Sequence, residues 1–490
     1  MSTSCRRRAF AFAVLSALVA PAARAQLEPR IVNGLMTTDY AAVGALLRGT
    51  DPGSAVSQCS GTLIGCSTFL TAAHCVCAGT GAGCQPPNAP DPGGYQVYLP
   101  HGGLFAVSSI TVRPDYAYPV GDLAIVNLAK PVNGIRPSEI NTTAAPPFGT
   151  SGTIVGFGRS GGSSWDYGLE RYGAVTTGEC PLLVSPTTSL CWTFDAAIGP
   201  PGTDSNTCNA DSGGPLFVDF GAGPRVAGVT SGGTSTDCLP TDQSFDANVF
   251  PYRSWVLSTG GTDLDPASCG ALPPVGDAAT TSLDLSGTVS AAAPESRSSF
   301  EVAAGTTLLR VAMNAVDDGT ANFDLYVKQG APPTPTSYDC ARTGAGQYGV
   351  CDLAAPSAGT WHALVRRVTG GGTAQVTATR FGASNLGVGL ASSLGAIAPG
   401  ETFPLTLSLD NRTDAPQRLA LLAMLVTPDG GTIPLIPARG VSLAQGQHVD
   451  ATLALPVPLA APRGTWTVGA VLWQAGAGVL DQAVLSFAVR

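Results

Sequence analysis

Three short segments in the first half of the chain carry side chains that could perform nucleophilic chemistry together. His74 lies in Leu70–Cys75, Asp122 precedes the apolar run Leu123–Val126, and Ser212 is followed by two glycines. A serine hydroxyl becomes a usable nucleophile when a histidine takes its proton and a carboxylate holds the other ring nitrogen of that histidine. Each residue alone also has a structural interpretation, because an aspartate before a strand is usually a turn residue. Together the three predict acyl transfer by Ser212, provided that the fold brings the side chains into contact.

The surrounding sequence predicts β-strands that would position these side chains. Gly61–Leu70 is strand-like and leads into His74, whose neighbour Cys75 can anchor it. The 490 residues include 61 glycines and 39 prolines and only 12% charged residues, which is typical of a β-rich globular protein. The length exceeds that of one ordinary domain, so about three domains are expected.

The order of His74, Asp122 and Ser212, with the motifs around them, makes residues 31–257 resemble the trypsin-like serine peptidases. The resemblance implies that His74 acts as general base and then as acid, that Asp122 orients it, and that Ser212 is the nucleophile. It also implies an oxyanion hole made by the backbone N–H groups of Ala210 and Ser212. Because Ala210 stands where the family usually has glycine, the alternative is a catalytically weak homologue that acts as a binding or adhesion protein.

The sequence Arg-Ile-Val-Asn-Gly at Arg30 and Ile31 resembles the activation site of a zymogen in that family. Cleavage after Arg30 would free the amine of Ile31, which in the family pairs with the aspartate before the catalytic serine, here Asp211. Residues 1–25 have a basic start, an apolar run and a small-x-small end, which is the pattern of a secretory signal. We therefore expect a propeptide of residues 26–30, an activating protease as partner, and a secreted protein, extracellular or periplasmic.

The resemblance also implies a pocket that selects the residue before the cleaved bond. Asn206 stands at its floor, where enzymes that cleave after arginine or lysine usually carry aspartate. Asp246 aligns close to the floor and could supply the missing charge, so a basic and a neutral or apolar preference both stay open. Gly232 stands where an aromatic residue is common, so the substrate-binding edge is expected to lack one apolar wall. The other residues expected to line the pocket are Ser231, Gly233 and Ser244.

Thirteen cysteines predict a disulfide-bonded protein, because twelve remain after Cys5 leaves with the signal. The family resemblance implies three pairs, which are Cys59–Cys75, Cys180–Cys191 and Cys208–Cys238. Further along the chain, the short loop between two cysteines suggests the pair Cys340–Cys351. The last four cysteines allow three pairings, of which we favour Cys77–Cys84 with Cys66–Cys269.

Two further units are expected after a peptidase-like unit of residues 31–260 and a linker of residues 261–278. The first of these is residues 279–382, within which residues 299–368 resemble the bacterial pre-peptidase C-terminal domain, and this resemblance implies a β-sandwich. Residues 385–490 alternate apolar and polar side chains, as in an immunoglobulin- or fibronectin-like β-sandwich. The chain is therefore predicted to be all-β, with a double Greek-key β-barrel peptidase domain followed by two β-sandwich domains. The motifs that carry the second resemblance are Phe300-Glu301-Val302, Asp324-Leu325-Tyr326-Val327 and Gly359-Thr360-Trp361.

The charge of the chain limits its partners. Without residues 1–30 it carries 20 basic and 33 acidic residues, a net charge of −13. Such acidity gives no electrostatic reason to bind nucleic acid or anionic lipid, and we expect no membrane span. We expect a monomer that acts on protein or peptide substrates without a cofactor. Asp317, Asp318 and Asp324 could hold a structural Ca²⁺, and a solvated acidic turn is the other interpretation.

Overall fold

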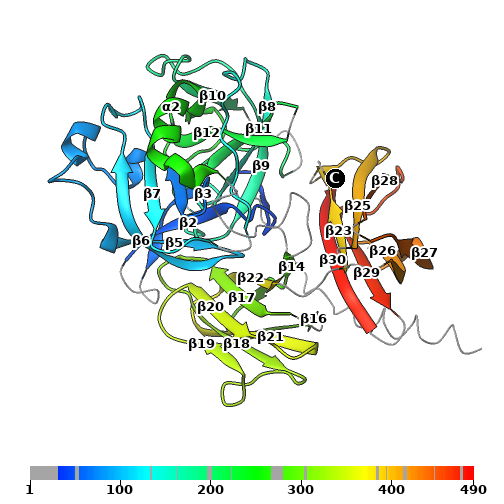
Figure 1. Cartoon of the computed structure of the whole chain (residues 1–490). Helices are drawn as coiled ribbons and strands as arrows, with labels where there is room; N and C mark the ends of the chain where they lie inside the picture. The colour runs from blue at the N-terminus through cyan, green and yellow to red at the C-terminus, as the bar shows by residue number, and fades with distance from the viewer. Residues whose placement is uncertain are drawn as a thin grey trace, which may run out of the picture.

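The structure is a computed structural model in which three β-rich bodies follow one another along the chain (Figure 1). In Figure 1 the peptidase-like body is blue to green, the second body yellow-green, and the third orange to red. Arg30, the segments that precede it and Cys269 lie outside the described residues. The described residues are 31–49, 55–132, 135–162, 164–195, 201–221, 223–265, 280–302, 306–381, 386–392, 394, 396–411, 416–445, 447–474 and 478–490.

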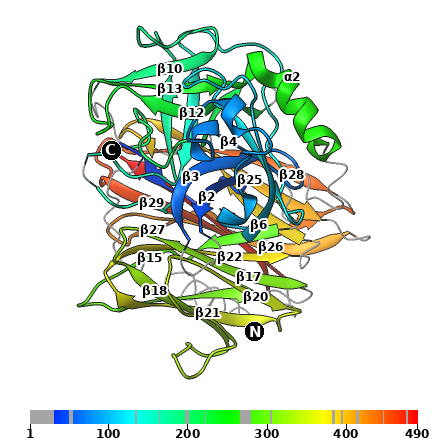
Figure 2. The ribbon, with the colours of Figure 1, turned by 90° about the vertical axis from the view of Figure 1, so that its left-hand side faces the viewer.

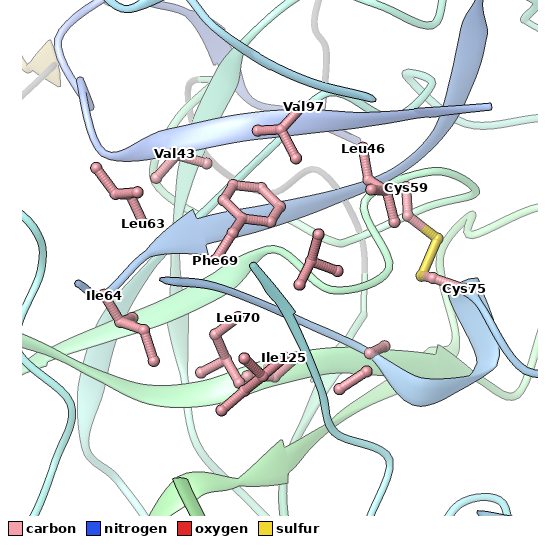
Figure 3. Packing of buried hydrophobic residues seen from close by; sticks show 14 of the residues in the cluster. Val43, Leu46, Cys59, Leu63, Ile64, Phe69, Leu70, Cys75, Val97 and Ile125 are labelled. Atoms are coloured by element: carbon pink, nitrogen blue, oxygen red, sulfur yellow. A yellow bond between two sulfur atoms is a disulfide. The ribbon is translucent and has the colours of Figure 1, made fainter. Parts of the chain in front are cut away.

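The first half of the peptidase-like body is a closed barrel of six strands. Phe69, Leu46 and Val97 fill its interior (Figure 3), and full burial of such a side chain contributes about 1.5–3 kcal/mol. Gly61 has no room for a side chain, because a Cβ there would lie 2.6 Å from Cζ of Phe69. The strands pair in the order β2 (Val43–Arg48), β3 (Val56–Leu63), β4 (Thr68–Thr71), β7 (Ala124–Leu128), β6 (Gly103–Val112) and β5 (Tyr95–Leu99). Short 3₁₀ turns are η1 (Ala73–Cys75), η2 (Gly81–Cys84) and η3 (Pro92–Gly94).

The second half of this body is a half-barrel, which together with the closed barrel forms the two-part all-β peptidase domain that the sequence predicted. The end strands β1 and β10 of this sheet do not pair with each other, and the sheet therefore stays open. Its order is β1 (Leu35–Met36), β9 (Arg171–Thr176), β8 (Ser151–Gly156), β11 (Pro215–Asp219), β12 (Pro224–Gly233), β13 (Asp242–Asn248) and β10 (Ser189–Phe194).

One α-helix occurs in the described part of the chain, α2 (Val249–Gly260), and it follows the half-barrel. Asn248 caps it by accepting a hydrogen bond from the Phe250 N–H (3.1 Å). The 3₁₀ turn η4 (Gly261–Leu264) continues the body, because the Asp263 carboxylate accepts hydrogen bonds from the backbone and hydroxyl of Ser67. These hydrogen bonds hold η4 on the barrel.

The second body is a sandwich of two antiparallel sheets around Phe300, Phe323 and Trp361. Its first sheet lies against the peptidase-like body, below the barrel in Figure 1 and again in Figure 2. That sheet contains β14 (Thr280–Asp284), β22 (Gly372–Phe381), β17 (Leu308–Ala315), β20 (Tyr348–Ala354) and, on β22, β15 (Gly287–Val289). The other sheet contains β16 (Glu295–Val302), β21 (Gly359–Thr369), β18 (Asn322–Gln329) and β19 (Cys340–Arg342).

The third body is also built from two sheets, and Phe403 and Phe487 stack in its core with ring centroids 3.8 Å apart. Trp361 in the second body and Trp466 in the third each follow a Gly-Thr pair that opens a long strand. Each indole N–H donates to the carbonyl oxygen four residues earlier at 2.9 Å, so the two segments share one local geometry. The sheets contain β23 (Leu386–Ala391), β25 (Thr402–Asn411) and β28 (His448–Pro456), and β24 (Ala396–Ile397), β30 (Gly478–Val489), β29 (Gly464–Gln474), β26 (Gln417–Val426) and β27 (Thr432–Leu443).

Five disulfides join described cysteines, and all five were predicted from the sequence. The other favoured pair includes Cys269, which lies outside the described residues. Among the described residues, no helix is long and apolar enough to cross a bilayer. The five pairs are Cys59–Cys75, Cys77–Cys84, Cys180–Cys191, Cys208–Cys238 and Cys340–Cys351.

Candidate active site

The barrel places His74 beside Asp122. Antiparallel pairing of β4 with β7 sets Thr71 opposite Ala124, so the turn after β4 meets the loop before β7. Asp122 is fully buried and accepts hydrogen bonds from the backbone N–H (2.9 Å) and the ring Nδ1 (2.7 Å) of His74. Because an ionised carboxylate can only accept, the proton sits on Nδ1 and leaves Nε2 as a base. The His74 side chain is 28% exposed, so substrate can approach the ring.

Ser231 supplies a further donor to the Asp122 carboxylate, a contact that sequence reasoning missed. The Ser231 Oγ donates to Asp122 Oδ2 at 2.6 Å. The residue was expected to line the specificity pocket, and its backbone does lie on the inner edge of β12. With three donors the orientation of the carboxylate is fixed, which in turn fixes the His74 ring.

Ser212 lies in the turn before β11, next to the disulfide that anchors His74. The Sγ atom of Cys75 lies 4.0 Å from His74 Nε2 and 3.7 Å from the Ser212 carbonyl oxygen. The Ser60 N–H on β3 donates to that same carbonyl at 2.8 Å. Within the described contacts, Ser212 Oγ makes no hydrogen bond to His74; catalytic hydrogen bonds of this kind are often long before substrate binds and shorten in the complex.

Ala210 adopts a backbone conformation that favours glycine. Its φ is +71°, in the left-handed region, where an L-residue is strained by about 1–2 kcal/mol. The Ser60 hydroxyl donates to the Ala210 carbonyl oxygen at 2.8 Å and holds the peptide in this orientation. The backbone at Ala210, where the family usually has glycine, thus adopts a conformation that the alanine Cβ disfavours. The surrounding hydrogen bonds maintain this φ.

Asp211 is buried beneath the same loop. Its carboxylate accepts the N–H groups of Gly158 (2.7 Å) and Cys208 (2.9 Å), and these are its hydrogen bonds within the described part of the chain. Burial raises the pKa of Asp211 to about 7, although the two N–H donors and the nearby Arg171 guanidinium act in the opposite direction. A carboxylate in this position favours a further cationic partner.

Ile31 is fully buried and packs with Trp192 and Leu216 in the half-barrel. Val32 exchanges two backbone hydrogen bonds with Asn206, both 3.0 Å long. The segment that follows the proposed cleavage site is therefore already docked beside the expected pocket floor. Arg30 lies outside the described residues.

Asn206 is buried and fully engaged. Its Oδ1 accepts from the Trp192 indole (3.1 Å) and from the Ser244 hydroxyl (2.7 Å). Its Nδ2 donates to Asp242 Oδ2 (2.9 Å) and to the Cys238 carbonyl oxygen (3.2 Å). The structure thus brings the expected floor residues Asn206 and Ser244 together.

Asp242, rather than Asp246, is the carboxylate in contact with Asn206. A Cβ on Gly233 would lie 2.8 Å from Asp242 Oδ2, so this carboxylate lies directly beneath the β12 edge. The sequence could have indicated Asp242. Side chains two residues apart on a strand point to the same face, so residues 242, 244 and 246 share one face of β13. From the sequence, only Asp246 was considered as the source of a negative charge in the pocket.

Asp246 is buried on the same strand but faces Gly228, where a Cβ would lie 2.6 Å from Asp246 Oδ2. Neither of its carboxylate oxygens accepts a hydrogen bond of good geometry from the described residues. Burial raises the pKa of Asp246 well above its ordinary value, and the Thr230 side chain opposes this only in part. This environment favours the neutral acid unless a cation reaches it.

Tyr118 corrects the expectation that the substrate-binding edge lacks an apolar wall at Gly232. A Cβ on Gly232 would collide with the Tyr118 hydroxyl and lie 3.0 Å from the Phe245 ring. Tyr118 also stands edge-on to the His74 ring, with centroids 6.0 Å apart. It lines a pocket with His74, Tyr116 and Ser231. A tyrosine from the loop before β7 therefore occupies the space that a side chain at residue 232 would fill.

The three aspartates considered for Ca²⁺ do not converge on one point. The Asp317 carboxylate accepts the Ser57 N–H (2.9 Å), and Asp324 accepts the Tyr326 hydroxyl (3.0 Å). Asp318 Oδ1 accepts hydrogen bonds within its own turn. The one group of three potential metal ligands in the described residues contains His74 and two disulfide-bonded cysteines, Cys59 and Cys75.

A barrel and a half-barrel that bring a buried Asp–His pair next to an accessible serine and a strained loop define the class of serine peptidases. The comparisons give the family. Residues 31–256 match the Trypsin family model, and residues 296–367 match that of the bacterial pre-peptidase C-terminal domain. The peptidase body belongs to the trypsin family, and the protein is a trypsin-like serine endopeptidase.

Curated relatives agree with this assignment. Fibrinolytic enzyme isozyme C of Lumbricus rubellus is 29% identical over 224 residues, which cover 42% of this chain and 89% of the relative. Trypsin eta of Drosophila erecta is 29% identical over 262 residues, 50% of this chain and 96% of the relative. The neutral protease of Vibrio proteolyticus is 34% identical over 109 residues, but these cover only 20% of this chain and 16% of that protein.

Proposed function

We propose that the protein is exported as a zymogen and becomes an active endopeptidase after cleavage behind Arg30. Residues 1–25 would act as the secretory signal and residues 26–30 as the propeptide. Five disulfides among the described cysteines support an oxidising compartment, outside the cell or in the periplasm.

In the proposed reaction, Ser212 Oγ attacks the substrate carbonyl carbon while His74 Nε2 takes the hydroxyl proton. The peptide N–H groups of Ala210 and Ser212 stabilise the oxyanion. His74 then gives its proton to the leaving amine, and an acyl-enzyme on Ser212 remains. His74 then takes a proton from water as that water attacks the acyl carbonyl. The bond from the acyl carbon to Ser212 Oγ breaks, His74 returns the proton to Ser212 Oγ, and the acid product leaves.

The observation that carries the proposal is the 2.7 Å contact between His74 Nδ1 and a fully buried Asp122. Three donors offset the cost of burying the Asp122 carboxylate, and the carboxylate in turn holds the partly exposed imidazole of His74 beside Ser212. The alternative of an inactive binding homologue has no support in the site, since each group that the reaction needs is present.

Labelling with a fluorophosphonate probe tests the proposal directly. Protein cleaved after Arg30 should be labelled at one site, and Ser212→Ala should abolish both labelling and peptide hydrolysis. Wild-type protein that is neither labelled nor active after cleavage would refute the enzymatic assignment of Ser212.

We further propose that the amine freed at Ile31 pairs with Asp211. Support comes from the burial of both residues and from the raised pKa of Asp211, which an ammonium partner would lower. Arg30→Gln should leave the protein folded and more than about 100-fold less active, because losing oxyanion stabilisation has an effect of this size. Full activity of uncleaved Arg30→Gln would contradict the pairing.

The residue preference at the cleavage site has two candidate determinants, Asp246 and Asp242. We propose that Asp246 receives a basic substrate side chain, supported by its buried and unsatisfied carboxylate. A peptide-library profile of wild type, Asp246→Ala and Asp242→Ala separates the two. Preference for arginine or lysine that survives Asp246→Ala would refute the role of Asp246, and a neutral or apolar preference in the wild type would refute basic specificity.

A further inference from the structure

The second body is held on the peptidase body by buried polar contacts. Asn314 on β17 and Gln375 on β22 are 0% and 1% exposed. Asn314 Nδ2 donates to the Gly168 carbonyl oxygen (2.6 Å), and its Oδ1 accepts from the Tyr98 hydroxyl (3.1 Å). Gln375 Oε1 accepts from the Glu170 N–H (2.6 Å), and its Nε2 donates to the Glu170 carbonyl oxygen (2.9 Å). The polar side-chain atoms of Asn314 and Gln375 therefore all find partners on the peptidase body.

Apolar packing accompanies these hydrogen bonds. Ala312 and Tyr348 of the second body belong to the same buried cluster as Tyr98 and Leu99 of the barrel. The rings of Tyr98 and Tyr348 lie 5.1 Å apart. A buried apolar cluster shared by two bodies is typical of a permanent interface rather than of a tethered appendage.

The peptidase segments that receive the contacts are hydrogen-bonded to the oxyanion loop. The Gly168 N–H donates to the Phe157 carbonyl oxygen, and the Phe157 N–H donates to the Ser60 hydroxyl, each at 2.8 Å. Ser60 in turn donates through Oγ to the Ala210 carbonyl and through N–H to the Ser212 carbonyl, each at 2.8 Å. Hydrogen bonds joined through the backbone of Gly168 and Phe157 therefore lead from the interface to the carbonyl oxygens of Ala210 and Ser212, the two residues whose N–H groups are the expected oxyanion donors.

A second connection runs through Asp317. Its Oδ2 accepts the Ser57 N–H (2.9 Å), and its own N–H donates to the Tyr167 carbonyl oxygen (2.8 Å). Tyr348 hydrogen-bonds to the Ser57 hydroxyl. Ser57 lies three residues before Ser60 on β3, which is about 10 Å along a strand. The first connection thus reaches Ser60 itself, and the second reaches Ser57 on the same strand.

We propose that the second body positions the oxyanion loop of the peptidase, and that Asn314 and Gln375 are positioning residues for catalysis. The loop needs outside support, because Ala210 is strained at its φ of +71° and would otherwise relax. This inference rests on the proposed oxyanion role of Ala210 and Ser212. A displaced donor weakens binding of the transition state more than binding of the substrate, so kcat should fall while KM stays nearly constant.

The test uses the full chain, cleaved after Arg30, with the variants Asn314→Leu and Gln375→Met. Both keep the approximate shape of the side chain and remove its hydrogen bonds. We expect kcat to fall at least tenfold, KM to change by less than about twofold, and affinity for a peptide aldehyde, whose adduct places an oxyanion in the hole, to fall in parallel with kcat.

The matched control is Thr379→Val, which removes a buried contact of the same interface, 3.2 Å from Thr379 Oγ1 to His101 Nδ1, without a link to Gly168. It should leave kcat and aldehyde affinity unchanged. Equal losses in Thr379→Val and Asn314→Leu would overturn the proposal, because they would reflect interface stability alone. Unchanged kcat in both Asn314→Leu and Gln375→Met would overturn it as well.

If Asn314→Leu fails to fold, Asp317→Ala tests the second connection, because it removes the carboxylate that accepts the Ser57 N–H. The Asp317 side chain is partly exposed. A folded Asp317→Ala variant with wild-type kcat and aldehyde affinity would count against positioning, and a loss confined to kcat would support it. Ser212→Ala keeps the two proposals separate: activity that survives Ser212→Ala refutes the catalytic assignment, whatever the interface variants do.

Discussion

Ala210 is an alanine in a backbone conformation that favours glycine, at a position with an expected role in catalysis. Alanine is small enough for the site, yet its φ of +71° is one that glycine adopts freely. The protein holds this conformation with the fully buried Ser60, which donates to the Ala210 carbonyl oxygen. The strain thus lies in the peptide that would stabilise the oxyanion.

Ala210→Gly should relieve this strain. We expect stabilisation by about 1 kcal/mol, because a left-handed φ costs glycine little. If the strain also displaces the oxyanion donor, kcat should rise by up to about tenfold with KM unchanged. Urea unfolding and steady-state kinetics measure the two effects. A destabilised variant with lower kcat would show that the alanine Cβ makes a favourable contact instead.

For single residues, the sequence predicts a role where the neighbouring positions in the chain are sufficient to identify it. The contexts of His74, Asp122 and Ser212 are each readable within a few residues. The Ser231–Asp122 and Ser60–Ala210 contacts join residues 109 and 150 positions apart, and strand register alone brings them together. Sequence reasoning without a register could not find them.

Among the structural elements, the short segment before β9 has an unusual environment, because the second body covers it. Glu170 there is fully buried, and neither carboxylate oxygen accepts a hydrogen bond of good geometry from the described residues. Burial raises the pKa of Glu170 well above its ordinary value, Asp39 and Asp284 add to the shift, and the Tyr40 N–H opposes it. The interface therefore encloses a carboxyl group that resists ionisation.

Glu170→Gln should make stability less dependent on pH. A carboxyl whose folded pKa exceeds its unfolded value favours folding at low pH, and this contribution is lost as pH rises from about 4.5 toward the folded pKa. In that window wild type should lose up to about 1.4 kcal/mol per pH unit relative to the variant. Urea midpoints between pH 5 and 8 measure the slope. Exposed Glu179→Gln is the control, and equal slopes for wild type and Glu170→Gln would contradict the expectation.

Strand patterns predicted the all-β class and the sandwich strands but not the covered face of the second body. Alternation along β17 and β22 predicts an apolar face and a polar face for each strand. Polar residues such as Asn314 and Gln375 would then be predicted to face solvent. Period-two alternation cannot show that another body covers the polar face. The contacts of the interface therefore could not be predicted from the strand pattern of either body alone.

Across the whole molecule, a buried ion pair joins the second and third bodies. Arg380 on β22 and Asp481 on β30 approach to 3.3 Å, with side chains 3% and 1% exposed. Asp481 also accepts the Val388 N–H (2.9 Å), and Arg380 donates to the Glu301 carbonyl oxygen (2.9 Å). The three bodies are thus fastened in sequence, first to second and second to third.

Asp481→Leu should destabilise the molecule by about 3–5 kcal/mol, because it leaves the Arg380 guanidinium buried without its counter-ion. The double variant Arg380→Met with Asp481→Leu should recover most of the loss. Thermal and urea unfolding of the full chain measure both. The exposed pair Arg297–Glu295 is the control, with an expected effect below about 1 kcal/mol. A double variant no better than the single one would argue against ion pairing as the cause.

The hydrogen bond from Gln375 to the Thr37 carbonyl oxygen joins residues 338 positions apart. At synthesis rates of about 5–20 residues per second, roughly 20–70 s separate the appearance of these two residues on the ribosome. The peptidase body is made first, yet its contacts with β17 and β22 can form only after those later strands have emerged. During this interval the newly made peptidase body lacks the contacts that the second body supplies, and this stage precedes the cleavage behind Arg30 that we propose for activation.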